Sequence, residues 1–199
     1  MNTGESHAWE RLKSLASEDV CSRTGATFDR EGNAYSLGLY NQRIGVSLGT
    51  GEICGTTPEA DHLLNALSYF SRLSVLSFLI HAKDVPPSGN LVKPAEMPGM
   101  EAMVRGSHTL PLHKLTARYA GDLKAFLERG KTYGGIPQDY GDASLLLHPF
   151  EVLPVVLIIR AGDEEFPANS SLLLDTTSRF QAPPDILWCI MMLSVLLMM

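Results

Sequence analysis

The sequence predicts an α+β fold, with a mostly antiparallel sheet packed against a long buried central helix and an apolar C-terminal helix. Short β-like segments separated by turn residues occupy residues 26–52 and 143–175. Helical patterns lie before, between and after these two groups. Strands and helices therefore do not alternate as in a doubly wound sheet. The length of 199 residues predicts a single α+β domain, residues 1–199.

The first group of strands follows a short helix. Residues 7–17 have an amphipathic pattern, with Trp9 on the apolar face. Residues 26–52 contain short strands separated by turn residues, which lie at Gly32-Asn33 and at residues 49–51. This order is typical of an antiparallel meander.

The central helix is expected to span residues 57–84. Thr57 can cap its first turn, and Pro58 suits the first helical position because the N–H that proline lacks has no partner there. The helix should end before Pro86, since a residue that precedes proline avoids the helical conformation.

The second half of the chain is expected to begin with helix and then form the second group of strands. Residues 110–131 predict one or two helices divided at Gly121, and residues 133–142 are a turn-rich connector. Three strands are expected at residues 143–150, 154–161 and 170–175. Two of them are continuously apolar, which indicates burial on both faces. The final helix follows Pro183-Pro184.

Composition argues against several classes of function. The net charge is -6 and no basic run occurs, which argues against nucleic-acid binding. The cysteines are Cys21, Cys54 and Cys189, with no CxxC pair, so we expect no zinc site and no intrinsic iron–sulfur cluster. The opening MNTGESHAWERLKS does not have the pattern of a signal peptide, so a cytoplasmic location is expected.

Two apolar stretches require a comparison with membrane helices. Leu63–Ile80 contains Arg72 near its middle, and a central arginine costs roughly 2.5–3.5 kcal/mol on insertion. Ile186–Met199 has 14 residues, fewer than a spanning helix needs. A membrane association is therefore not expected. The second stretch predicts a helix that is buried in the core or that joins two copies of the chain as a homodimer.

Two short motifs resemble catalytic or phosphate-binding sequences without their context. Ser47 lies in a G-x-S-x-G match, but it falls within a predicted strand that a glycine-rich turn follows, whereas a nucleophile elbow needs a helix there. The glycines at 49–55 do not open the helix directly, as phosphate binding requires. Neither motif predicts an active site.

Three consecutive acids, Asp163, Glu164 and Glu165, follow the second apolar strand. In an extended segment Asp163 and Glu165 project to the same side. Two like charges this close repel each other unless a cation or an arginine lies between them. Carboxylate oxygens suit Mg²⁺ or Ca²⁺, so Asp163 and Glu165 are the candidate metal ligands.

Asp175 completes the set of candidate ligand- or cation-binding residues, which are Asp163, Glu164, Glu165 and Asp175. It is expected to return to the same end of the sheet if Leu157–Arg160 and Leu172–Asp175 form a hairpin. Two other interpretations stay open for the acidic turn. One is an ion-pair hub with Arg160, Arg179 or Arg105, and the other is an ordinary solvated turn.

The stretch LPVVLIIRAGDEEFPANSSLLLD resembles an uncharacterised family of proteins from anaerobes, the domain of unknown function 3786. The resemblance extends more loosely over AWERLKSLASEDVCSRTGATFD, PPSGNLVKPAEMPGM and LTARYAGDLKAFLERGKTYGG. Some members of that family carry or neighbour ferredoxin-like cluster domains. The resemblance therefore implies anaerobic redox or cofactor metabolism as the context, without a reaction. An iron–sulfur role would come from a partner protein.

Two functions follow from these observations. The first is a soluble binding or accessory protein beside a redox or iron–sulfur-linked system, in which the acidic turn is a structural or docking feature. The second is an enzyme in which Asp163, Glu165 and Asp175 hold a divalent cation against an anionic small molecule.

Overall fold

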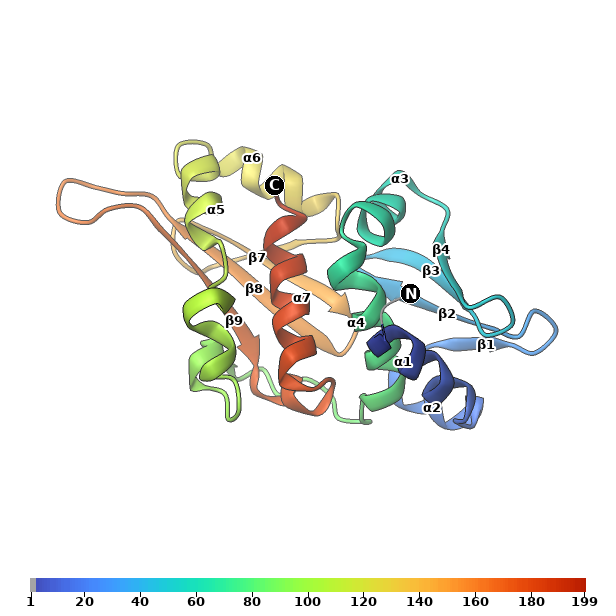
Figure 1. Ribbon diagram of the computed structural model, residues 1–199. Coiled ribbons are helices and arrows are strands. Elements are labelled where there is room, and N and C mark those ends of the chain that lie inside the picture. Colours follow the sequence, from blue (N-terminus) through green and yellow to red (C-terminus); the bar gives the residue numbers. More distant parts are fainter. Residues whose placement is uncertain (1–2) are drawn as a thin grey trace.

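The first sheet is a four-stranded antiparallel meander at the N-terminal side of the chain (Figure 1). The computed structural model describes residues 3–199. The strands are β1 (Thr27–Asp29), β2 (Ala34–Leu39), β3 (Gln42–Ser47) and β4 (Glu52–Gly55). Alternate side chains of β2 are buried, as in a sheet with one face on the core. The predicted meander is confirmed.

The second sheet has five antiparallel strands in the order β5-β9-β8-β7-β6. The strands are β5 (Leu91–Val92), β6 (Ile136–Gln138), β7 (Ala143–Phe150), β8 (Leu153–Arg160) and β9 (Asn169–Asp175). The three strands expected in the second half are present, and β8 lies between β7 and β9. Its side chains are buried from Leu153 to Ile159, because helices also pack on this strand. Residues 133–142, expected to be only a connector, also contribute the edge strand β6.

Tyr40 joins the two sheets. It lies in the turn between β2 and β3, where Tyr40 and Asn41 both have positive φ, 47° and 63°. Its backbone N–H donates to the carbonyl of Pro149 at 3.1 Å. Its buried hydroxyl lies 2.8 Å from Ser194 Oγ and donates to the carbonyl of Ile190 at 3.0 Å. One residue thus ties the meander to β7 and to the C-terminal helix.

The central helix is broken, so the expectation of one helix over residues 57–84 is wrong. It consists of α3 (Pro58–Asp61), a π-helical turn (His62–Ala66) and α4 (Ser68–His81). Thr57 Oγ1 accepts the N–H of Ala60 at 3.1 Å, which confirms the predicted cap. The axis bends by 97° at the break. The bend lets α3 and the π-helical turn pack on the meander while α4 packs on three other helices.

The remaining helices are α1 (Thr3–Lys13), α2 (Ser17–Thr24), α5 (Leu112–Tyr119), α6 (Leu123–Lys131) and α7 (Pro184–Leu196). The split between α5 and α6 at Gly121 is as predicted, whereas α2 was not expected. Short 3₁₀ turns at Ala102–Val104 and Gly106–His108 lie in the long connection before α5.

Helix α7 lies in front of the second sheet and beside α4 (Figure 1). Most of its side chains are buried, which agrees with a C-terminal helix in the core. The partly exposed residues are Trp188, Cys189, Met192 and Leu196. A homodimer through Ile186–Met199 stays a prediction. The α+β class is confirmed.

No single helix within residues 3–199 is both long and apolar enough to cross a bilayer. The bent pair Pro58–Ala66 and Ser68–His81 passes that test by length and composition only.

Candidate functional site

The acidic turn lies in the loop between β8 and β9, which projects from the body of the molecule (Figure 1). Asp163 Oδ1 accepts the backbone N–H groups of Glu165 at 2.9 Å and of Phe166 at 2.7 Å. The N–H of Asp163 donates to the carbonyl of Phe166 at 2.9 Å. The N–H donors of Phe166 and Glu165 hold the pKa of the Asp163 carboxyl below its ordinary value. This carboxylate therefore shapes its own loop.

Glu164 and Glu165 are exposed beside it. None of the ion pairs formed by the described residues includes Asp163, Glu164 or Glu165, so the structure gives no support to the ion-pair hub. No group of three or more His, Cys, Asp or Glu side chains in residues 3–199 is arranged to hold a metal ion. Binding of Mg²⁺ or Ca²⁺ by Asp163 and Glu165 stays a prediction, and the observed geometry is that of a solvated turn.

Replacing Asp163 with alanine is expected to loosen this loop without affecting the rest of the fold. The N–H groups of Glu165 and Phe166 lose their common acceptor, so their hydrogen exchange should accelerate. Amide exchange measured by NMR tests this, with Glu164→Ala as the control because no hydrogen bond of its side chain shapes the loop. Equal exchange in the two variants would contradict this role of Asp163.

Asp175 does not join the acidic turn, and the expectation that it returns to the same end of the sheet is wrong. Strands β8 and β9 do form a hairpin, but Arg160 pairs with Asn169 and Leu157 with Leu172. The residue nearest the turn in β9 is therefore Asn169. Asp175 lies six residues farther along, about 20 Å from that end of the strand.

Asp175 is instead a buried acceptor that joins two loops. Its carboxylate accepts the N–H and hydroxyl of Ser88, the N–H of Gly89, and the N–H and hydroxyl of Thr177. The side chain is 0% exposed. Burial by itself would raise the pKa of this carboxyl, but the hydrogen bonds from Thr177 and Ser88 outweigh burial and lower it. Asp175 therefore has a structural role.

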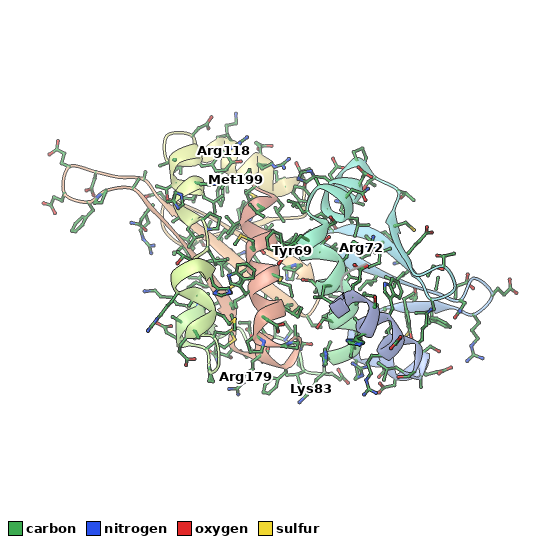
Figure 2. The ribbon with its side chains drawn as sticks, viewed as in Figure 1. Tyr69, Arg72, Lys83, Arg118, Arg179 and Met199 are labelled. Carbon is green, nitrogen blue, oxygen red and sulfur yellow. The ribbon has the colours of Figure 1, made fainter. Side chains whose placement is uncertain are left out.

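A different set of residues lines a cleft of about 510 Å³ between α1, α4, the turns at residues 102–108 and α7. The sequence did not single out this cleft. Its principal side chains are Glu5, Tyr69, Arg72, Met103, His108 and Trp188. Figure 2 labels Tyr69 and Arg72 along α4, with Tyr69 the nearer of the two to α7.

Two aromatic residues form part of the cleft wall. Tyr69 is 76% exposed, one of the few large apolar side chains of the described residues that lie mostly in solvent. Trp188 is held in place, because its Nε1 donates to the carbonyl of His108 at 2.7 Å. Its ring also makes edge contacts with Phe70 and His108, at centroid distances of 5.8 Å and 5.4 Å. The indole is therefore oriented before any ligand arrives.

An ion pair contributes polar groups to the same cleft. Arg72 Nε lies 3.1 Å from Glu5 Oε1, and the two side chains are 25% and 16% exposed. The pair connects α4 to α1. A guanidinium has four N–H donors besides Nε, so Arg72 can also bond to an oxygen of a ligand.

Cys189 lies in the cleft but has the properties of an ordinary buried thiol. Burial, and to a smaller extent the charge of Asp185, raises its pKa to about 11. The thiol is then protonated at neutral pH and is a poor nucleophile. The arrangement of the cleft is suited to binding a ligand, and it does not resemble a cysteine-dependent active site.

The cleft residues come from positions 5 to 189, so no local motif reveals them. Two weak signals exist in the sequence. Tyr69 and Arg72 interrupt the apolar pattern of the central helix three residues apart, and Trp188 is the one tryptophan of the apolar C-terminal segment. Residues three apart on a helix face the same side, so a pattern search can detect the pair Tyr69 and Arg72.

Comparisons with known proteins give one match. The family model described as Domain of unknown function (DUF3786) matches residues 16–196, which include α4 and α7 but not α1. No curated protein and no solved structure matches the chain. The match covers most of the sequence and agrees with the resemblance seen around the acidic turn. The chain therefore belongs to the family of domain of unknown function DUF3786.

Proposed function

We propose that this protein is a cytoplasmic binding or accessory protein that holds a small molecule with an aromatic or conjugated ring in the cleft between α4 and α7. The observation that carries the proposal is a cleft of about 510 Å³ with Tyr69 and Trp188 in its lining. Pockets for small organic ligands have volumes of roughly 300–1,000 Å³ and are mostly apolar with a few polar groups.

The state of Trp188 before binding supports this proposal. A side chain that is already fixed loses little conformational entropy when a ligand stacks on it. The hydrogen bond to the carbonyl of His108 and the contact with Phe70 fix the indole. A planar ring that enters the cleft would contact this indole, and such contacts favour aromatic ligands.

The biological context in this proposal rests on the family resemblance. We propose that the protein acts beside an anaerobic redox or iron–sulfur-linked system, with a separate partner protein as the carrier of any cluster. A ring-bearing cofactor or its precursor is a class of ligand that suits such a context and the chemistry of the cleft.

A neutral aromatic probe tests the proposal. N-phenyl-1-naphthylamine should bind with saturable fluorescence and quench the emission of Trp188. Trp188→Leu is expected to weaken binding at least tenfold, about 1.4 kcal/mol. Tyr69→Ser is expected to weaken it by a smaller factor, because this more exposed ring covers less of the ligand.

The matched control is Tyr140→Ser. Tyr140 is another exposed tyrosine, 43% exposed, and does not line the cleft. Its replacement should leave the affinity unchanged. Lack of saturable binding, or an equal loss in the Tyr140→Ser and Trp188→Leu proteins, would overturn the proposed function.

A further inference from the structure

A second cavity of about 320 Å³ adjoins the cleft, because Leu73, Asp185 and Ile186 line both. The second cavity lies between α1, the end of α4 and the start of α7. Its lining differs in character from that of the cleft. Much of this lining is apolar, as at Leu73 and Ile80, and the titratable side chains on it are those of His7, Arg11, His81 and Asp185.

Arg11 and His7 lie on the same face of α1, since they are separated by one helical turn. His81 faces them from the last turn of α4. Within residues 3–199 the side chains of His7, Arg11 and His81 form no hydrogen bond or ion pair. Their donors therefore remain available on the wall of the cavity.

Two arginines and one aspartate lie near the imidazole of His81. Burial lowers the pKa of His81, and the guanidinium groups of Arg11 on α1 and Arg23 on α2 lower it further, whereas Asp185 on α7 raises it. Arg11 and Arg23 thus lie close enough to the imidazole to repel its proton. An anion placed between these groups would relieve the repulsion and gain hydrogen bonds from Arg11 and His81.

We propose that the second cavity is an anion subsite, which binds a phosphate-like group of the ligand whose ring occupies the cleft. This inference rests on the proposed function. Arg72 and His81 are nine residues apart on α4, so the polar groups of the two cavities are separated by about 14 Å along the helix. The ligand class is therefore an elongated molecule with a ring near one end and a phosphate group near the other.

Inorganic phosphate tests the subsite by itself. In an NMR titration at pH 6.0 and constant ionic strength, the ring resonances of His7 and His81 should shift saturably, while those of His113 should not. Arg11→Gln should weaken phosphate binding at least fivefold. Arg118→Gln is the matched control, because Arg118 is an exposed arginine on α5 away from both cavities, and it should change nothing.

Replacing Asp185 should change the affinity for phosphate in the opposite direction to Arg11→Gln. Its carboxylate lines the cavity and repels an anion, so Asp185→Asn should strengthen phosphate binding about two- to threefold. Unchanged histidine resonances, or equal losses in the Arg11→Gln and Arg118→Gln proteins, would overturn the anion subsite.

An elongated probe, 8-phenyloctyl phosphate, separates this inference from the proposed function, because its alkyl chain lets the ring and the phosphate lie about 14 Å apart. It should bind at least fivefold more tightly than inorganic phosphate, and Trp188→Leu should remove only that gain. If phosphate binds at His7 and His81 but 8-phenyloctyl phosphate shows no gain, the subsite stands and the aromatic cleft fails. If the neutral naphthylamine binds in the cleft but phosphate does not move the histidine resonances, the subsite fails and the proposed function stands.

Discussion

Asp175→Ala is expected to lower the free energy of unfolding by about 4 kcal/mol. The substitution removes the acceptor of donors on Ser88, Gly89 and Thr177 in a region that water does not reach. Each buried donor left without an acceptor costs about 1–3 kcal/mol, and the loop relaxes enough to recover part of that loss. Urea unfolding at pH 7 measures the change. A loss below about 1 kcal/mol would contradict the structural role of Asp175.

The same carboxylate predicts a dependence on pH. The pKa of Asp175 is lower in the folded protein than its ordinary value of about 3.9, so its ionised form stabilises the fold. This stabilisation is present in full above pH 4 and is lost as the pH falls through the lowered folded-state pKa. The difference in stability between the wild type and Asp175→Asn should therefore be constant near neutrality and shrink below pH 4.

Phe78→Ala is expected to cost about 4 kcal/mol of stability. Phe78 on α4 and Phe150 on β7 are fully buried and stack in parallel, with ring centroids 3.9 Å apart and an interplanar angle of 1°. Truncating one ring leaves a cavity that the rigid sheet cannot fill. Thermal or urea unfolding measures the loss.

Two further phenylalanine variants make this result specific. Phe78→Leu keeps most of the volume and should cost less than about 1.5 kcal/mol. Phe166→Ala removes a ring that is 67% exposed at the acidic turn, and its effect should stay within about 0.5 kcal/mol. A loss in Phe78→Ala no larger than that in Phe166→Ala would contradict the packing of α4 on the second sheet.

The sequence was sufficient for the elements that depend on apolar runs and local caps. The continuously apolar strand around Val156 is the centre of the second sheet, and Thr57 with Pro58 opens the first helical turn. These features follow from burial and from backbone hydrogen bonding within a few residues. The bend at Leu67 was not predictable in this way, because a π-helical turn changes hydrogen-bond partners without changing the apolar pattern.

The candidate site was harder to predict because its residues are brought together by the fold. The charges of Asp163 and Asp175 predicted a site on the hairpin, but its register separates the two carboxylates, and each accepts hydrogen bonds from neighbouring loop residues. The cleft depends on the approach of α1, α4 and α7, and the contact between α4 and α7 in turn depends on the bend at Leu67. Tyr69 and Trp188 are far apart in sequence and line the same cleft only in the folded chain.

The position of bound N-phenyl-1-naphthylamine is the most direct measurement of ligand binding between α4 and α7. Intermolecular nuclear Overhauser effects locate the naphthyl protons relative to assigned side chains. We expect cross-peaks to the rings of Trp188 and Tyr69, both of which line the cleft. Cross-peaks confined to another surface, such as the exposed side chains of Ile136 and Tyr140, would contradict a ligand site in the cleft.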